Sequence, residues 1–463
     1  MFQSPRGTFD ILPADQPYWR HIRDHVEAWC ARFGYERIDT PIFEEAALFT
    51  HATGQGTDIV EKEMYTFEDR SGDLLALRPE GTPNTLRAYV QHGMASLPQP
   101  VRLYYWAPSF RYERPQAGRY RQFWQFGCEA IGEADAAIDA EQIELCVRLY
   151  DSLGLRNIQL QLNSIGDATC RPAYIDSLRA YYAPRLDVVC PDCRQRYERN
   201  ALRLLDCKNP ACQPIIAEAP VITHHLCADC SAHFASVRAY LDEIGIAYVI
   251  APRLVRGLDY YTRTVFEFVP EGGGQQSTVG AGGRYDGLME TLGGRPTPGT
   301  GFALGIDRLV LNLKEAEAYV PPLPRAEVYV AYQVEEARGA ATRVASALRS
   351  AGIGTIAGAG RSLKSQLRQA DALGMTYTVI IGRQELASGT AQVRRMADGG
   401  QYHVDLEDLP KALASLLDTG VEMHASYDQH RVDQDVGAAM TFGTPTQLQQ
   451  DTGEGYVGPP PRD

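Results

Sequence analysis

Four arginines, Arg111, Arg114, Arg119 and Arg121, surround a short glycine-containing loop. A planar guanidinium group offers paired N–H donors, so clustered arginines suit the oxygens of a phosphate. Glu113 stands among them, and an arginine–glutamate network on the protein surface is the alternative interpretation. The cluster therefore indicates either phosphate binding or a surface ion-pair network.

The segment after this loop alternates between two kinds of side chain. Successive side chains of a strand point to opposite faces of the sheet. One face would carry Arg121, Phe123, Gln125, Gly127 and Glu129, and the other Gln122, Trp124, Phe126 and Cys128. The second set is mostly apolar and fits a core. The first set is either a polar binding surface or a face turned to solvent.

A carboxylate and a hydroxyl, Glu80 and Thr82, stand where a strand over 74–78 gives way to a helix. Such an acceptor pair suits a substrate amino group. Helix capping alone accounts for Thr82 but not for Glu80 at the turn. The two residues therefore favour an amino-group site.

Arg256 precedes a glycine turn and the paired tyrosines Tyr260 and Tyr261. These groups could bracket a polar aromatic ligand, although strand tyrosines are more often part of a core or its rim. Residues 301–309 read as a strand, a glycine and a helix with Arg308 near its start. A helix N-terminus with an arginine can bind an anion, but such segments are common.

Six of the ten cysteines lie between residues 190 and 230, with two histidines beside them. Paired C-x2-C elements are typical of structural zinc, and one tetrahedral ion takes at most four ligands. The spacing suggests a zinc site at Cys190, Cys193, Cys227 and Cys230. Reduced, partly buried thiols are the alternative.

The chain has 463 residues, 44% of them hydrophobic and 22% charged, which excludes a disordered or collagen-like protein. No stretch of about 20 residues is apolar throughout, and the start lacks the apolar core of a signal peptide. The cysteines are therefore expected to be reduced, in a cytoplasmic protein that does not enter a membrane. The net charge of −13 argues against a general polyanion binder.

The elements that position these residues follow from periodicity. Apolar spacing predicts a helix between Asp15 and Gly34, then a strand over 35–43 interrupted by Pro41. Proline in a strand marks an edge or an interface, so this pair of elements indicates either core packing or a dimer contact. Further strands are expected over 101–106, 121–130 and within 247–268.

A proline-rich linker at 321–324 precedes alternating strands and helices between 327 and 381, which predicts a small α/β domain. The expected elements are strands over 327–332, 353–358 and 376–381 and helices over 335–350 and 362–374. Residues 421–463 hold seven acidic and two basic residues and are expected to form a flexible acidic tail.

Taken together, these segments resemble a class II aminoacyl-tRNA synthetase, and closely the histidyl-tRNA synthetases. The helix and Pro41 strand resemble the first class signature, the segment from Phe110 to Glu129 the second, and Gly301–Arg308 the third. Residues 254–267 and 281–288 are similar to segments peculiar to the histidyl enzymes. The resemblance covers residues from about 4 to 420.

The resemblance implies an α+β fold, with an antiparallel catalytic sheet flanked by helices, a helical insertion and a C-terminal α/β anticodon-binding domain. It places the catalytic domain at 1–168 and 236–320, the cysteine-rich insertion at 169–235, the anticodon-binding domain at 325–420 and the tail at 421–463. It also implies a homodimer built on the first signature.

The resemblance further implies ligation of L-histidine to tRNA(His) through a histidyl-adenylate, with ATP and Mg²⁺, releasing AMP and diphosphate. Arg111 and Arg256 match the catalytic arginines on the α-phosphate. The expected histidine-binding residues are Glu80, Gly81, Thr82, Arg111, Gln125, Glu129, Arg256, Tyr260 and Tyr261. The expected ATP-binding residues are Arg111, Glu113, Arg119 and Arg308, and Arg114 and Gln116 match positions that meet the tRNA acceptor end.

Two non-catalytic alternatives share this resemblance. One is the regulatory subunit of ATP phosphoribosyltransferase, which lacks the anticodon-binding domain and usually has a degraded arginine–tyrosine segment. The other is a sensor domain that binds uncharged tRNA. The segment at 325–420 argues against the first, and intact Arg111, Arg256 and Arg308 argue against the second.

Overall fold

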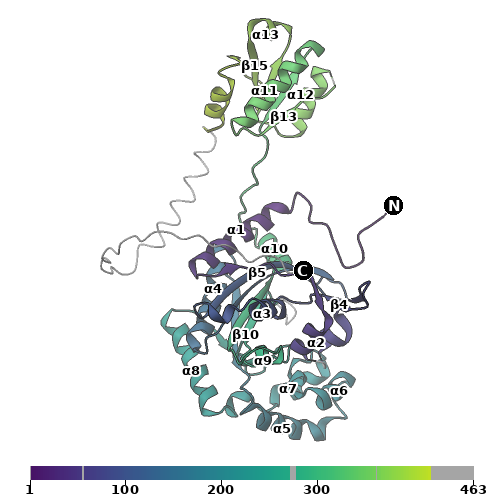
Figure 1. Ribbon diagram of the computed structural model, residues 1–463, viewed down its shortest axis with the longest axis vertical. Helices are drawn as coiled ribbons and strands as arrows, with labels where there is room; N and C mark the ends of the chain where they lie inside the picture. Colours follow the sequence, from purple (N-terminus) through teal and green to yellow (C-terminus); the bar gives the residue numbers. More distant parts are fainter. Residues whose placement is uncertain (1, 55–56, 272–277, 361, 419–463) are drawn as a thin grey trace, which may run out of the picture. The chain divides into compact units, whose positions relative to one another are not determined.

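The computed structural model describes residues 2–54, 57–271, 278–360 and 362–418. The chain divides into two compact units, Met1–Leu323 and Pro324–Asp463 (Figure 1). The predicted acidic tail, 421–463, lies outside the described residues. Among the helices that are described, none has the length and apolar content that a bilayer crossing requires.

The first unit is built on an eight-stranded sheet in the order β1-β5-β6-β11-β10-β9-β7-β8. Its six central strands pair antiparallel, and the short edge strands β1 and β8 pair parallel with their neighbours. In sheet order the strands are Glu36–Arg37, Val101–Phe110, Gln122–Ile131, Gly299–Gly305, Gly280–Arg284, Thr262–Pro270, Ile158–Ser164 and Val249–Ile250.

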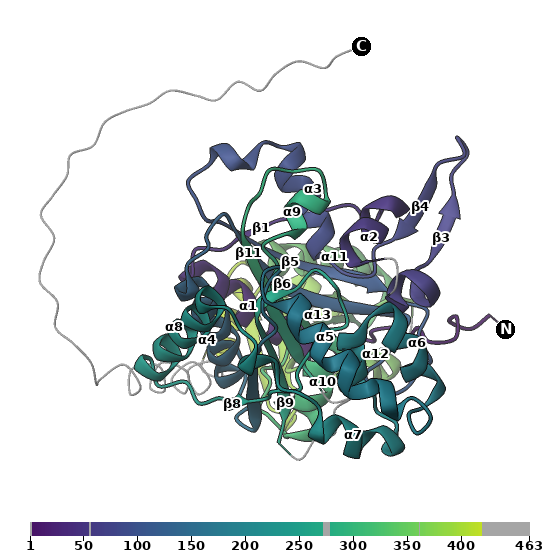
Figure 2. The same cartoon turned by 90° about the horizontal axis from the view of Figure 1, so that it is seen from below.

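Four helices cover one face of this sheet, namely α1 (Gln16–Arg32), α4 (Ala136–Ser152), α8 (Ala228–Glu243) and α10 (Ile306–Glu315). The predicted first helix is confirmed, and its buried residues Trp19, Ile22, Val26 and Cys30 repeat with helical spacing. In both views α8 lies beside α4 (Figures 1 and 2). The apolar side chains Phe126 and Cys128 of β6 point into this core, as the strand alternation predicts.

The opposite face of the sheet carries smaller elements. These are α2 (Ala46–Thr53), the π-helical turn η1 (Ile59–Glu63), α3 (Thr82–Gln91), the 3₁₀ turn η2 (Met94–Ser96) and α9 (Leu288–Thr291). A separate antiparallel sheet in the order β2-β4-β3 comprises Phe43–Glu45, Leu74–Leu77 and Thr66–Glu68.

The predicted strand over 35–43, interrupted by Pro41, is corrected by this arrangement, because its two ends belong to different sheets. Residues 36–37 belong to the large sheet and residues 43–45 to the small one, so the chain passes between two sheets at Pro41. Proline cannot donate a ladder hydrogen bond. The buried Arg78 side chain donates instead to the carbonyl oxygens of Thr40, Pro41 and Pro108, which joins the crossing segment to the large sheet.

Between β7 and α8 the chain forms short helices that gather away from α1 and α4 (Figure 1). They are α5 (Arg171–Tyr182), η3 (Ala183–Arg185), α6 (Pro191–Arg199), η4 (Ala201–Asp206), η5 (Pro210–Cys212), α7 (Gln213–Glu218) and η6 (Ile222–His224). The expected boundary at residue 235 falls inside α8, whose Phe234, Val237 and Leu241 pack in the core beneath the large sheet.

The second unit has a five-stranded sheet in the order β13-β12-β14-β15-β16, mixed parallel and antiparallel. Its strands in chain order are Val328–Tyr332, Thr355–Ala357, Tyr377–Ile381, Thr390–Arg395 and Gln401–Asp405. Its helices are η7 (Glu335–Ala337), α11 (Arg338–Ser350), α12 (Leu363–Ala372) and α13 (Arg383–Ser388). The alternating elements expected between 327 and 381 are confirmed, whereas α13, β15 and β16 lie beyond them.

A buried ion pair joins three elements of the first unit. Arg284 of β10 and Asp139 of α4 are both wholly buried, with Nε 3.1 Å from Oδ2. The same carboxylate oxygen lies 2.6 Å from Nε2 of His233 in α8. Charges in the interior require close partners, so Asp139 holds both helices at one end of the sheet.

We predict that Asp139→Ala lowers the free energy of unfolding of the first unit by about 3 kcal/mol, because it removes the wholly buried partner of Arg284 and leaves that buried charge paired only with the partly exposed Asp286. Urea unfolding followed by tryptophan fluorescence measures this, since all four tryptophans lie in that unit. Asp24→Ala is the matched control, because Asp24 pairs with Arg20 on the exposed face of α1 and should contribute about 0.5 kcal/mol or less. Equal losses in the two variants would contradict the assignment.

Candidate functional site

A cavity of about 600 Å³ opens on the face of the large sheet opposite α1 and α4. It gathers residues from segments nearly 230 positions apart in the chain. Ten predicted site residues line it: Glu80, Thr82, Arg111, Glu113, Arg119, Gln125, Arg256, Tyr260, Tyr261 and Arg308. The segments that sequence analysis singled out separately therefore share one cavity.

Three guanidinium groups lie close together at one side of the cavity. Arg111 follows β5 and donates from Nε to the Pro79 carbonyl at 2.9 Å, and Arg119 pairs with Glu113 at 3.2 Å. Arg308 at the start of α10 donates from Nε to the Gly118 carbonyl at 2.9 Å. Burial lowers the pKa of Arg308, and the charges of Arg119 and Arg111 lower it further. A bound polyanion would relieve this repulsion.

Arg256 contributes a further guanidinium from a distant part of the chain. It pairs with Glu267 of β9 and lies 5.7 Å from the centre of the Tyr261 ring. The Thr278 hydroxyl donates to the other Glu267 oxygen at 3.2 Å. Glu267 therefore orients Arg256 on the wall of the cavity beside β9.

Glu80 carries a buried acceptor that the described residues leave unsatisfied. The Tyr260 hydroxyl donates to its Oε2 at 2.8 Å, whereas Oε1 has no hydrogen-bond partner. Burial raises the pKa of the Glu80 carboxyl, while the charges of Arg111 and Arg256 oppose that rise. A buried acceptor without a donor is costly, so this oxygen suits a ligand that donates, such as an ammonium group.

Glu129 lies behind the cavity wall and is wholly buried. The Thr82 hydroxyl donates to its Oε1 at 2.6 Å, and the Tyr285 hydroxyl donates to its Oε2. Burial raises the pKa of Glu129 to about 8, against the opposing effect of these two hydrogen bonds. At neutral pH this carboxyl is therefore mostly protonated.

Two predicted histidine-binding residues do not line the cavity. Glu129 adjoins the cavity beside Thr82 and Tyr285, two lining residues whose hydroxyls donate to its oxygens. Gly81 packs on Tyr105, where a Cβ atom would lie 2.4 Å from the ring. Gly81 thus acts by leaving space for Tyr105 beneath the turn that positions Glu80.

The sequence assigned no role to Tyr285 or Tyr105, and it did not show that Gly301 and Gly127 leave space for Glu129 and Tyr105. A Cβ at Gly301 would lie 2.0 Å from Oε2 of Glu129, and one at Gly127 would lie 2.3 Å from the Tyr105 ring. Gly301 is the cross-strand neighbour of Glu129 in β11. The signal that could have indicated this packing is a glycine in the neighbouring strand, directly opposite the carboxylate.

Gln125 projects into the cavity from β6, on the same face as Phe123. The Ser109 hydroxyl donates to Oε1 of Gln125 at 2.9 Å, which fixes the orientation of its amide. Arg114 and Gln116 lie instead on the exposed tip of the β5–β6 hairpin, outside the cavity lining. The backbone of Gln116 pairs with that of Arg119 and closes the tip.

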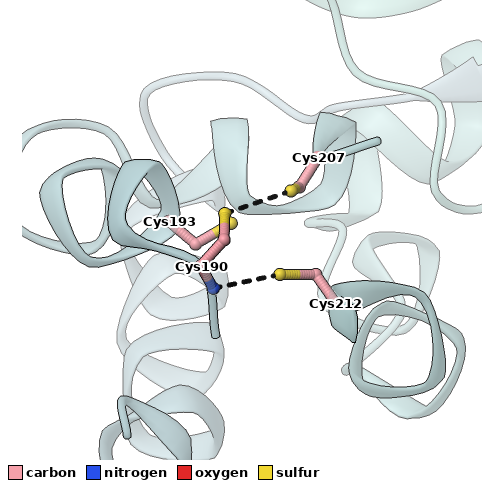
Figure 3. A group of neighbouring side chains, drawn as sticks. All are labelled: Cys190, Cys193, Cys207 and Cys212. Carbon is pink, nitrogen blue, oxygen red and sulfur yellow. Dashed lines mark hydrogen bonds between the residues drawn. The ribbon is translucent and has the colours of Figure 1, made fainter. Parts of the chain in front are cut away.

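The predicted zinc ligand set is wrong, because the structure separates its two C-x2-C elements. Cys190 and Cys193 group with Cys207 and Cys212 (Figure 3), whereas Cys227 and Cys230 group with Asp167 and Cys170. The reason is that the chain folds back through η4 and η5 to the start of α6. Cys227 and Cys230 begin α8 at the base of the insertion, beside the segment that leaves β7.

The chain matches two family models, one described as histidyl-tRNA synthetase over residues 7–309 and one as anticodon binding domain over residues 327–416. It is 54% identical over 410 residues to histidine–tRNA ligase of Dehalococcoides mccartyi strain 195, a match that covers 88% of this chain and 98% of that protein. It is 48% identical over 406 residues to that of Desulforamulus reducens, covering 88% and 97% of the two chains.

A solved structure of ligand-free Staphylococcus aureus histidyl-tRNA synthetase is 37% identical, with a TM-score of 0.75, and the match covers 89% of this chain and 99% of that one. Both the sequence and the fold therefore match the same family over most of the chain. The expected fold class, an α+β class II catalytic domain followed by an α/β anticodon-binding domain, is confirmed. This chain belongs to the histidyl-tRNA synthetase family of the class II aminoacyl-tRNA synthetases.

Proposed function

We propose that this protein is a histidine–tRNA ligase, which activates L-histidine with ATP and transfers the histidyl group to tRNA(His). The observation that carries the proposal is the single cavity in which clustered arginines adjoin a buried, unsatisfied carboxylate oxygen. The arginines suit the phosphates, and the Glu80 carboxylate suits the amino group of an amino acid.

In the first step a histidine carboxylate oxygen attacks the α-phosphorus of ATP, the bond to the β-phosphate oxygen breaks, and diphosphate leaves. Both reactants are negative, so cations must flank the phosphorus to stabilise the additional charge of the transition state. Arg111 on one wall and Arg256 on the other would do this. The nucleophile is already ionised, so the step needs no general base.

ATP would lie with its terminal phosphates toward Arg119 and Arg308, accompanied by Mg²⁺ on the phosphate oxygens. Glu113 would contact the adenine, and it also holds Arg119 in place at 3.2 Å. In the second step a hydroxyl of the tRNA 3′ end attacks the histidyl carbonyl carbon, and AMP leaves.

Selectivity for histidine would come from groups that pair with its polar atoms. Glu80, Thr82 and Gln125 would hold the amino group. Glu129 and Tyr261 would pair with the two ring nitrogens, with Tyr260 holding Glu80 in position. A site built on hydrogen bonds rejects analogues that lack them by a factor of about 10⁴.

The exposed hairpin tip with Arg114 and Gln116 would meet the acceptor end of the tRNA, and the second unit would bind the anticodon. We also propose a homodimer in the cytoplasm, where aminoacylation serves translation. Large apolar side chains support the dimer: Ile42, Phe43, Phe67 and Leu74 are all exposed on or beside the β2-β4-β3 sheet. Such a patch suits burial against a second copy.

The reaction is tested by histidine-dependent exchange of labelled diphosphate into ATP. We predict exchange with histidine and not with other amino acids, and a loss of at least about 100-fold in Arg256→Ala, because one of the two flanking cations is removed. Histidine binding by Arg256→Ala should remain measurable by calorimetry.

Arg20→Ala is the control for that loss, because Arg20 lies on the exposed side of α1, outside the cavity lining, and exchange should stay within twofold of wild type. No exchange by the wild-type protein would overturn the proposed function. Near-normal exchange by Arg256→Ala would overturn only the role of Arg256.

Histidine affinity should rise with pH between 7 and 8. The Glu129 carboxyl, with a pKa of about 8, must lose its proton before it can accept from a ring N–H. As the pH rises, a smaller fraction of the protein still carries that proton. The ionised fraction grows about fivefold over this interval, so the dissociation constant from calorimetry should fall about fivefold.

Glu129→Gln removes the titrating group, so its weaker histidine binding should not vary with pH over the same interval. A wild-type dissociation constant that is constant between pH 7 and 8, or a variant with the same slope as wild type, would refute the role of Glu129.

A further inference from the structure

Four cysteines of the insertion converge on one point from three separate turns. Cys190 is the N-cap of α6, Cys193 lies in its first turn, Cys207 ends η4, and Cys212 ends η5. Their sulfur atoms point toward one another (Figure 3) and all lie within 4.8 Å. The chain supplies them with the spacing C-x2-C-x13-C-x4-C.

The spacing of the sulfur atoms fits a single tetrahedral ion. Zinc–sulfur bonds are about 2.3 Å long, which places the sulfurs of a tetrahedral site about 3.8 Å apart. The Sγ atoms of Cys190 and Cys207 are 3.7 Å apart. A multi-iron cluster would separate some of the sulfurs further, because they are divided among different iron atoms.

Backbone N–H groups point at two of these sulfurs. The amide of Cys190 donates to Cys212 Sγ at 3.3 Å, and that of Asn209 donates to Cys207 Sγ at 3.4 Å. Hydrogen bonds of this kind favour thiolates and orient metal ligands. Residues 190–213 hold five basic and three acidic residues, a surplus that offsets the charge of −2 on a divalent ion with four thiolates.

The surrounding segment also has little regular secondary structure. Between Asn200 and Cys212 the chain forms only 3₁₀ turns, although Cys193 and Cys212 are almost wholly buried. Small segments with little regular structure commonly depend on a bound metal for their stability. Reduced thiols would fill the same space, but they would link the turns only by weak hydrogen bonds to sulfur, such as that from the Cys190 N–H to Cys212 Sγ.

We propose that Cys190, Cys193, Cys207 and Cys212 bind one structural zinc ion. The ion would hold the η4–Cys207 segment against the catalytic cavity. From that segment, Asp206 and Lys208 line the cavity. Arg203 donates to the Gly257 carbonyl at 2.9 Å, next to Arg256, and pairs with Asp58 at 3.0 Å.

The group formed by Asp167, Cys170, Cys227 and Cys230 is not included in this proposal. Its carboxylate already accepts the backbone N–H groups of Thr169 and Cys170 and lies 3.7 Å from the Arg263 guanidinium. This group therefore serves as the internal comparison, and it shares no residue with the proposed site.

Metal content of the purified full-length protein tests the proposal. We expect one zinc per chain in wild type and in Cys227→Ser/Cys230→Ser, and less than about a tenth of an ion in Cys207→Ser/Cys212→Ser. Two zinc ions per chain in wild type would also support the site, provided that Cys207→Ser/Cys212→Ser loses one of them. Less than a tenth of an ion in wild type, iron in place of zinc, or full retention by Cys207→Ser/Cys212→Ser would overturn it.

Cobalt substitution tests the same site in the wild-type protein, so the result does not depend on whether a cysteine variant folds. The wild-type protein, stripped of metal and titrated with Co²⁺ alone, should show the visible and sulfur-to-metal charge-transfer bands of a tetrahedral tetrathiolate, saturating at one equivalent. Stripping should also speed protease cleavage within residues 186–220 at least tenfold, and Zn²⁺ should reverse the effect. Absence of the bands, together with unchanged cleavage, would overturn the proposal.

Discussion

The site depends on holding several guanidinium groups close together in a cavity that is partly shielded from water. Burial lowers the pKa of Arg308, and the neighbouring charges of Arg119 and Arg111 lower it further. Their repulsion is balanced by carbonyl acceptors and by Glu113, and Arg256 is balanced by Glu267. Such a cavity stabilises a bound anion electrostatically. The stabilisation is larger still for a transition state in which the negative charge on that anion increases.

The part of the site that could be predicted from sequence was the part encoded locally. Alternation along residues 121–129 separated a polar face from the core, and Gln125 of the polar face lies in the cavity while Phe126 lies beneath it. The arginine cluster and the turn that carries Glu80 could also be recognised from local sequence. The passage between two sheets at Pro41 was not, because strand pairing of residues 43–45 depends on residues 74–77, which lie far along the chain.

Other features depend on convergence that no local pattern encodes. Tyr285 reaches Glu129 only because β10 and β6 flank β11, and Gly301 of β11 leaves space for the carboxylate between them. The predicted set of zinc ligands was wrong for the same reason. Sequence spacing identifies two C-x2-C elements, but the fold decides which cysteine-bearing turns lie close together. The insertion then becomes part of the catalytic wall through Arg203, Asp206 and Lys208 rather than a separate appendage.

The proposed convergence of Arg111 and Arg256 on one phosphorus is tested most directly by a crystal structure with a non-hydrolysable sulfamoyl analogue of histidyl-adenylate. Both guanidinium groups should lie within about 3 Å of the sulfamoyl oxygens, on opposite sides, with Glu80 on the amino group. An Arg256 side chain that still faces only Glu267, or an analogue bound away from Arg111, would contradict the account.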